Sequence, residues 1–247
     1  MKKFIENLPK IELHLHIEGT LEPDLMFELA KRNNINIPFT SSEEIKNAYQ
    51  FHNLQSFLDI YYQGANVLIN EEDFFDMTWA YLLRCQADNV IHTEIFFDPQ
   101  THTQRGVAFD TVVNGINKAL VQANKELGIS SELIMCFLRH LDEASAFETL
   151  ESALAHKDKI IGVGLDSSEL GNPPEKFERV FKESIKQGFI TVAHAGEEGP
   201  ANWIQDALEL LSITRIDHGV RCVEDEMLVS TLAANRTPLT VCPLSNT

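Results

Sequence analysis

Residues 11–18 alternate strictly between apolar and ionisable side chains. Because successive side chains of a strand point to opposite faces, this pattern predicts a strand with one apolar and one ionisable face. An ordinary amphipathic strand with incidental histidines fits so short a segment as well, and the rest of the chain has to decide between the two interpretations. The ionisable positions are Glu12, His14, His16 and Glu18.

Residues 21–86 show a different period. Apolar residues recur there at spacings of three and four, which predicts a long helical insertion, or lid, after the first strand. Beyond it, short apolar runs bounded by turn residues return and predict further strands. These strands are expected at 90–97, 132–138, 160–165, 189–194, 215–218 and 238–242.

The clearest helical pattern between these strands covers residues 172–188. Asn172 is expected to cap the N-terminus of the helix and Gly188 to end it. The apolar stripe expected on its buried face consists of Phe177, Phe181 and Ile185.

Seven strands in β/α order argue for parallel pairing with helices outside. We predict an α/β fold, a (β/α)8 TIM barrel with seven of its eight strands present, as a single domain over residues 1–247. A doubly wound open sheet would alternate in the same way, but such sheets usually carry a glycine-rich phosphate loop after an early strand. The only similar segment here, Gly162-Val-Gly164, lies inside a later strand.

Composition narrows the class of protein. A chain of 247 residues with 44% hydrophobic residues can form a large core and is not intrinsically disordered. The net charge of −17 repels nucleic acid and anionic membrane surfaces. The sequence shows no signal peptide and no membrane-spanning run, and its four scattered cysteines are typical of a reducing compartment. We therefore expect a cytoplasmic protein that binds neither nucleic acid nor membranes.

Reactive side chains gather at the carboxyl ends of three predicted strands, which is where the active site of a barrel lies. Nine histidines occur in the chain, and four of them are at these ends. The reactive residues are His14, His16 and Glu18 on the first strand, His194 and Glu197 on the fifth, and His218 on the sixth.

These residue types suit a hydrolytic zinc site. Two histidines from one strand and His194 from another supply three nitrogen ligands and leave room for a carboxylate and a water molecule. Glu197 is placed to act as an acid toward a substrate nitrogen, and His218 to orient or deprotonate the water. Each residue also has a structural alternative: a core histidine for His194, a charge at a helix N-terminus for Glu197, and a packing role for His218.

Other metal and nucleophile signatures are absent or incomplete. Two segments match H-x-E, but the nucleobase deaminases that use it also need P-C-x-x-C, which the chain lacks. Neither H-E-x-x-H nor G-x-S-x-G occurs. The remaining histidines have no spacing that joins them to the site, so we expect structural roles for His52, His92, His102, His140 and His156.

Four segments together resemble the adenosine/adenine deaminase family of zinc hydrolases. They are ELHLHIEGTLEP at 12–23, TVAHAGEE at 191–198, RIDHGV at 215–220 and VCPLSNT at 241–247. Three more look like the adenine deaminase branch, which acts on the free base: HIEGTLEP at 16–23, FDPQTHT at 97–103 and GLDSSELGNPP at 164–174.

The resemblance implies a barrel of the metal-dependent hydrolase type that converts adenine to hypoxanthine and ammonia. It implies that Glu197 donates a proton to the purine ring nitrogen N1, that His218 positions or activates the water, and that the Gly164 backbone contacts purine N3. The implied ligands of one zinc ion are His14, His16 and His194.

Glu18 stands where nucleoside deaminases of the family carry an aspartate that meets the ribose. Its longer side chain would crowd a sugar, which agrees with a base as substrate. The family also places two consecutive aspartates on an eighth strand, and the sequence stops at Thr247 before such a strand. We therefore expect a C-terminally incomplete barrel with weak zinc affinity and little turnover, since an open barrel exposes two strand edges.

Three alternatives stay open at this point. The first is an adenosine deaminase, which forms inosine. The second is another barrel metallohydrolase that cleaves an amide or an ester. The third is an inactive, truncated purine-binding fragment.

Overall fold

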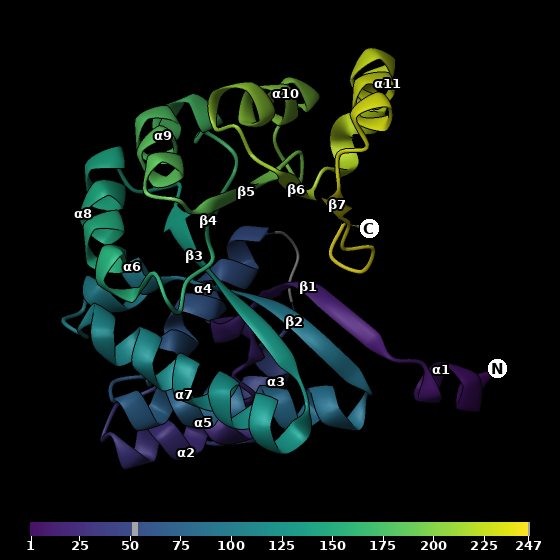
Figure 1. Cartoon of the computed structure of the whole chain (residues 1–247). Coiled ribbons are helices and arrows are strands. Elements are labelled where there is room, and N and C mark those ends of the chain that lie inside the picture. Colours follow the sequence, from purple (N-terminus) through teal and green to yellow (C-terminus); the bar gives the residue numbers. More distant parts are fainter. Residues whose placement is uncertain (51–53, 247) are drawn as a thin grey trace. The chain divides into compact units, whose positions relative to one another are not determined.

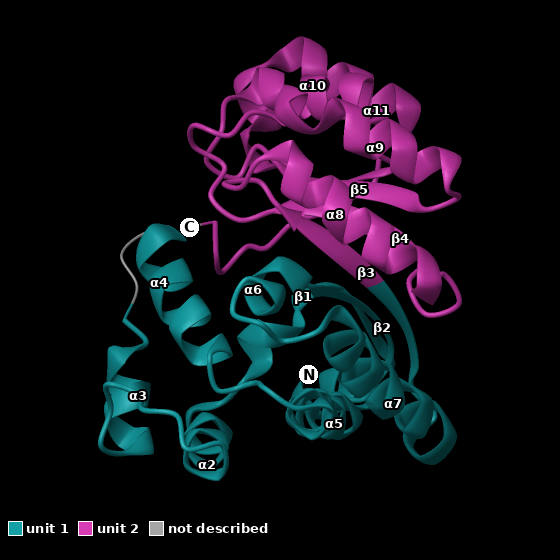
Figure 2. Cartoon of the chain, turned by 90° about the vertical axis from the view of Figure 1, so that its left-hand side faces the viewer, with its two compact units in different colours: residues 1–133 teal, residues 134–247 magenta. Residues whose placement is uncertain are grey.

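The computed structural model describes residues 1–50 and 54–246. The chain divides into two compact units, residues 1–133 (unit 1) and 134–247 (unit 2), which Figure 2 colours separately. His52 and Thr247 lie outside the described residues. The predicted extent of one domain over the whole chain stays a prediction.

Unit 1 contains two complete strands, β1 (Lys10–His16) and β2 (Val90–Phe97), which pair in parallel. A third strand, β3 (Ser130–Leu138), begins in unit 1 and ends in unit 2. The helices of unit 1 are α1 (Lys2–Asn7), the 3₁₀ turn η1 (Ile17–Thr20), α2 (Pro23–Arg32), α3 (Ser42–Ala48), α4 (Leu54–Ala65), α5 (Glu71–Ala87), α6 (Pro99–Thr103) and α7 (Phe109–Leu127).

The predicted helical insertion at 21–86 is occupied by α2 to α5 in its described part. Helix α5 begins with a capping box, in which Asn70 and Asp73 exchange side-chain and backbone hydrogen bonds. Helix α7 approaches α5 closely at Gly115, where a Cβ atom would lie 2.4 Å from the carbonyl oxygen of Glu71. Only glycine permits this packing of the two long helices. The role of the insertion as a lid stays a prediction.

Unit 2 holds the later strands, β4 (Gly162–Asp166), β5 (Ile190–Ala195), β6 (Arg215–His218) and β7 (Leu239–Thr240). Between them lie α8 (Glu143–Ala153), η2 (Leu154–His156), η3 (Pro174–Phe177), α9 (Glu178–Lys186), α10 (Ala201–Leu210), η4 (Val220–Glu224) and α11 (Glu226–Asn235).

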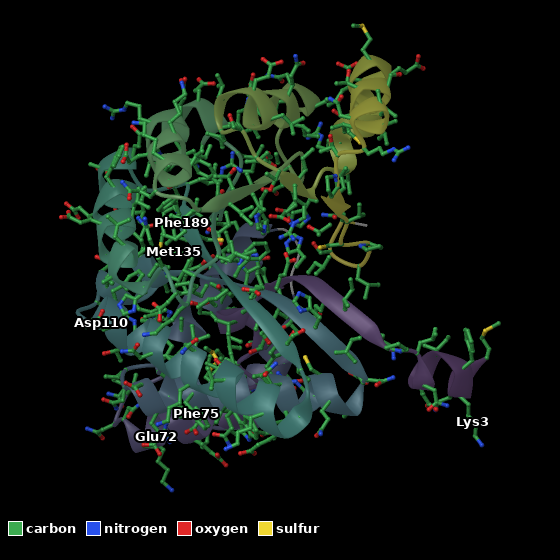
Figure 3. The ribbon with its side chains drawn as sticks, viewed as in Figure 1. Lys3, Glu72, Phe75, Asp110, Met135 and Phe189 are labelled. Carbon is green, nitrogen blue, oxygen red and sulfur yellow. The ribbon has the colours of Figure 1, made fainter. Side chains whose placement is uncertain are left out.

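The strands are hydrogen-bonded in chain order from β1 to β7, and helices alternate with them along the chain (Figure 1). The pairs from β3 to β7 are parallel, as is the pair of β1 with β2. The α/β class and the seven strands are therefore as predicted. The strands carry much of the core: Met135 of β3, labelled in Figure 3, is fully buried.

Two local predictions were wrong. Strand β1 ends at His16, so Glu18 lies in the turn η1 rather than on the strand. Asn172 does not cap a helix; its side-chain amide donates to the carbonyl oxygen of Ser168, and the regular helix α9 starts six residues later, at Glu178. Phe177 and Phe181 are buried as predicted, but Ile185 is not part of the buried stripe, because 41% of its surface is exposed.

Within the described residues, no helix combines the length and the apolar character that crossing a membrane requires.

Candidate active site

Strand β1 carries His14 and His16 on one face. Their ring centroids lie 5.8 Å apart, and both rings contact Phe96 of β2, at 5.4 Å for His14 and 4.9 Å for His16. A ring nitrogen of His16 and a carboxylate oxygen of Asp98, which follows β2, lie within 4.8 Å of each other. Unit 1 thus offers two imidazoles and a carboxylate, which are suitable ligands for a divalent cation.

Glu18 follows on η1 and is buried, with 3% of its surface exposed. Its carboxylate accepts a hydrogen bond from the backbone N–H of Asp98 at 3.0 Å. The hydroxyl of Tyr61 lies 3.1 Å from one Glu18 oxygen, and Nε2 of His102 lies 3.0 Å from the other. The carboxylate is therefore held by groups from α4, α6 and the end of β2.

Arg105 fixes the direction of the hydrogen bond between His102 and Glu18. Its Nη2 lies 2.8 Å from Nδ1 of His102. A guanidinium can only donate, so Nδ1 is the acceptor and the ring proton lies on Nε2, which donates to Glu18. Burial lowers the pKa of His102 and favours this neutral ring. Burial alone raises the pKa of Glu18, but the hydrogen bonds from His102 and the Asp98 backbone bring it below its ordinary value.

Sequence reasoning gave His102 no link to the site, and the structure shows that it contacts a predicted site residue. The FDPQTHT segment at 97–103 supplies both Asp98 and His102. Its position directly after a strand was the available signal, because residues at the carboxyl ends of barrel strands face the active site.

In unit 2, strand β5 presents His194, which is 6% exposed. Its Nδ1 lies 3.1 Å from the carbonyl oxygen of Leu165. A carbonyl can only accept, so Nδ1 carries the ring proton and Nε2 keeps its lone pair. Histidines that bind metals are typically oriented in this way, by donating the other N–H to a backbone carbonyl.

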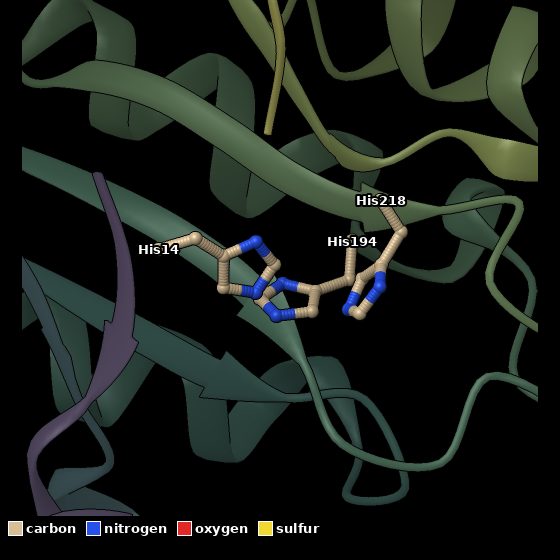
Figure 4. Close-up of side chains that lie close together, drawn as sticks. All are labelled: His14, His194 and His218. Atoms are coloured by element: carbon tan, nitrogen blue, oxygen red, sulfur yellow. The ribbon is translucent and has the colours of Figure 1, made fainter. Parts of the chain in front are cut away.

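His218 ends β6, beside His194. The two ring centroids lie 5.1 Å apart, and a ring nitrogen of one lies within 4.8 Å of a ring nitrogen of the other (Figure 4). Nε2 of His218 lies 3.5 Å from a carboxylate oxygen of Glu197, and Nδ1 lies 3.2 Å from Oδ1 of Asn246. His218 also has a φ of +68°, a backbone conformation that is uncommon for residues other than glycine.

The residue before His218, Asp217, is fully buried. One of its carboxylate oxygens accepts hydrogen bonds from Arg215 at 2.9 Å and Thr240 at 2.6 Å. The other lies 3.9 Å from Nδ1 of His194. Burial raises the pKa of Asp217, and the charge of Arg215 opposes that effect only in part.

Gly164 lies within β4 and pairs with Cys136 of β3. A Cβ atom at this position would lie 2.7 Å from the Cys136 sulfur, so the residue must be small for the strands to pack. The expected contact of its backbone with a purine stays a prediction.

Sequence reasoning also missed Arg139 and Glu169, two charged residues that are almost fully buried in unit 2. Arg139 contacts His194 near the end of β5, and Glu169 contacts Glu197 in the loop that follows. Their positions at the ends of β3 and β4 were the signal that could have found them.

Comparison with known sequences gives one consistent result. The family model described as adenosine deaminase matches residues 9–247. The chain is 67% identical over 246 residues to the adenine deaminase of Vibrio parahaemolyticus, covering all of this chain and 73% of the relative. It is 64% identical over 246 residues to the adenine deaminase of Wolinella succinogenes, covering all of this chain and 74% of the relative.

Two solved structures are similar over nearly the whole chain. The adenine deaminase of Arthrobacter aurescens is 54% identical and superposes with a TM-score of 0.94, covering 96% of this chain and 73% of that one. An amidohydrolase from Burkholderia ambifaria with bound zinc is 26% identical, with a TM-score of 0.91, and the match covers 99% of this chain and 68% of that one. The match to the first structure confirms the predicted barrel class.

Proposed function

Because the chain belongs to the adenosine deaminase family, we propose that it is an adenine deaminase, which hydrolyses adenine to hypoxanthine and ammonia. The relatives at 67% and 64% identity carry this activity in their names, as does the solved structure at 54% identity. They support the free base, rather than adenosine, as the substrate.

We propose that one zinc ion per chain is bound by His14, His16 and His194. The donor chemistry fits, because neutral imidazole nitrogens are preferred zinc ligands and His194 has its proton on Nδ1, with Nε2 left to coordinate. The bound zinc in the Burkholderia relative supports the choice of metal. When bound, zinc supplies a Lewis acid that makes water nucleophilic near neutral pH.

The single observation that carries the mechanism is the Glu197–His218 pair in unit 2, with its separation of 3.5 Å. In the proposed reaction, His218 orients the attacking water and accepts its proton. Glu197 donates a proton to ring nitrogen N1 as the water oxygen bonds to C6. The proton held by His218 then passes to the amino group, which leaves as ammonia when its bond to C6 breaks, and the proton of the added hydroxyl returns to Glu197 as C6=O forms. An acid and a base side by side suit this exchange, because general acid–base catalysis needs both within hydrogen-bonding reach of the reacting atoms.

Glu18 and Gly164 are the proposed contacts to the purine side of the site. The Asp98 backbone N–H and the His102 ring donate to the Glu18 carboxylate, and the Tyr61 hydroxyl is shared between Glu18 at 3.1 Å and Asp98 at 2.8 Å. These contacts make the carboxylate a fixed wall rather than a movable side chain. Such a wall supports exclusion of a ribose.

The scattered cysteine positions, with no C-x-x-C pair, support the proposed cytoplasmic location, since disulfide frameworks are rare there. The cysteines are Cys85, Cys136, Cys222 and Cys242.

The test is a direct comparison of substrates. Purified, zinc-loaded protein is incubated with adenine or adenosine, and hypoxanthine, inosine and ammonia are measured. We expect kcat/KM for adenine to exceed that for adenosine by at least about 100-fold, the scale of discrimination that a binding pocket achieves. A preference for adenosine would identify the alternative substrate. Because little turnover is expected from the 247-residue chain alone, the same assay is run on a C-terminally extended chain, and no turnover of either purine by both proteins would refute the proposal.

A further inference from the structure

We propose that Glu169 is a positioning residue that holds the loop after β5, and with it Glu197, in its working shape. The inference rests on the proposed function in one respect only, the role of Glu197 as proton donor. The loop and Glu169 both lie in unit 2.

A single carboxylate accepts all the backbone N–H groups at the start of this loop. Glu169 is buried, with 1% of its surface exposed. Its Oε1 accepts from Gly196 at 2.8 Å. Its Oε2 accepts from Glu197 at 3.0 Å, from Glu198 at 2.9 Å and from Gly199 at 2.8 Å.

Successive N–H groups converge on one point only when the backbone curls around that point. Gly196 makes the curl possible with a φ of +69°, in the left-handed region that glycine adopts without strain. A concave set of backbone N–H groups is an anion-binding nest. Here the anion belongs to the protein itself, and it comes from the loop after β4.

Arg139 completes this arrangement from the end of β3. Its side chain is fully buried; Nη1 donates to the carbonyl oxygen of His194 at 2.8 Å and lies 4.0 Å from Oε1 of Glu169. Its Nε donates to the carbonyl oxygen of Asn172 at 2.9 Å. The buried negative charge therefore has a buried positive neighbour, and the pair joins the loops after β4 and β5 to the end of β3.

This arrangement matters for chemistry because Glu197 is itself one of the donors. Its backbone N–H is fixed by Glu169, and its side chain faces His218. A proton donor must lie within hydrogen-bonding reach of the atom it protonates, and a displacement of about 1 Å can cost about 100-fold in rate. Glu169 does not touch the reacting atoms in this scheme; it acts through Glu197.

The test compares two matched substitutions in unit 2. Glu169→Gln keeps the shape of the side chain but places an amide NH₂ group, which cannot accept, against N–H donors. The control is Glu143→Gln, because Glu143 also accepts backbone N–H bonds, from Arg179 at 2.9 Å and Val180 at 3.0 Å, at the start of α9. A third variant, Glu169→Asp, retains the charge on a shorter side chain.

We expect Glu169→Gln to lower kcat for adenine about 100-fold with KM changed by no more than about threefold, and Glu143→Gln to leave both nearly unchanged. Glu169→Asp should recover part of the lost kcat. A folded Glu169→Gln protein with wild-type kcat would overturn the proposal, as would an equal loss of kcat in the Glu143→Gln control.

Amide hydrogen exchange provides a readout that does not depend on activity. The amides of residues 196–199 should exchange faster in Glu169→Gln and Glu169→Asp than in wild type, and should not change in Glu143→Gln. If the wild-type chain does not deaminate adenine, the kinetic comparison bears on the proposed function, and the exchange experiment still decides whether Glu169 holds the loop. Unchanged exchange at 196–199 in both Glu169 variants would refute the positioning role.

Discussion

Two buried carboxylates, one in each unit, are held in different ways. Glu18 receives hydrogen bonds from the Tyr61 hydroxyl and the His102 ring, and only one from a backbone N–H, that of Asp98. Glu169 is held by backbone N–H groups throughout.

The two kinds of support suit two different roles, substrate selection for Glu18 and loop positioning for Glu169. A carboxylate held largely by side chains depends on which residues surround it, so its position, and with it the choice of substrate, changes when a neighbour is substituted. A carboxylate held by the backbone does not depend on the side chains of Glu197 and Glu198, although the curl of the loop requires glycine at position 196. Glu169 therefore fixes the shape of the loop, and the side chain of Glu197 does not have to contribute to that shape.

The largest effect is expected from Glu197→Gln, which removes the proposed acid but leaves its backbone N–H to bind Glu169. The kcat for adenine should fall by about 10²- to 10⁴-fold, the usual contribution of general acid catalysis, with little change in KM. Steady-state kinetics and thermal unfolding check this result together. A loss below about tenfold in a folded protein would show that the loop does not present the acid.

Next in size is the effect of His102→Phe on the side-chain-held carboxylate. This change removes one donor to the buried Glu18 carboxylate, while Nη2 of Arg105 loses its His102 acceptor but keeps the carbonyl oxygens of Ala65 and Leu68. Because buried polar groups that lose a partner are costly, the free energy of unfolding should fall by about 2–3 kcal/mol, as measured by urea denaturation. The control is His92→Phe, at an exposed contact with Ser130, which should cost less than about 1 kcal/mol. Equal losses of stability in the two variants would contradict a buried hydrogen bond from His102 to Glu18.

Asp73 in unit 1 combines both modes of support. Its carboxylate accepts backbone N–H bonds from Ile69 and Asn70, and it also binds the side chains of Arg32 and Asn33. Burial alone raises the pKa of Asp73, but the Asn70 N–H and Arg32 outweigh it, and the pKa lies below its ordinary value.

A carboxyl whose pKa is lowered on folding stabilises the protein above its unfolded pKa, about 3.9 for aspartate, and this stability is lost as pH falls through the folded pKa. Asp73→Asn should therefore lower the free energy of unfolding by about 1–2 kcal/mol at pH 7. The gap to wild type should narrow progressively as pH falls through the lowered pKa of the folded state, because the wild-type carboxyl then becomes neutral as well. Urea denaturation measured across this pH range is the check. A constant difference in unfolding free energy between Asp73→Asn and wild type would contradict the prediction.

The smallest effect is expected from Glu198→Ala. The variant keeps its backbone N–H bond to Glu169, and burial together with the Glu169 charge already raises the pKa of the Glu198 carboxyl. Stability should change by no more than about 0.5 kcal/mol, and kcat by no more than about twofold. A loss of kcat as large as that expected for Glu169→Gln would mean that the loop depends on its side chains after all.

The sequence predicted the strands best where an apolar run ends at turn residues. Strands β2 and β6 match their predicted ranges to the residue. The prediction was wrong at Glu18 because the alternating pattern continues into a 3₁₀ turn, and alternation alone cannot distinguish the last residues of a strand from the turn that follows it.

The chemistry-bearing residues were easier to find than their supports. His194 and Glu197 stand out by type and by position, at the end of β5 and just after it. Glu169 also follows a strand, but that position alone does not show which of 37 acidic residues accepts the N–H groups of the loop that carries Glu197. Glu169 and His102 act through hydrogen bonds to distant segments. Such contacts depend on the folded backbone rather than on local pattern.

The left-handed backbone of His218, at φ +68°, places stability and catalysis in opposition at one position. Asparagine and glycine tolerate this conformation better than histidine does. A population of variants selected for heat resistance alone should therefore drift toward the substitutions His218→Asn and His218→Gly, and lose the proposed base as it gains robustness. If histidine persists at position 218 under selection for heat resistance, this outcome would contradict a stability cost of its left-handed backbone.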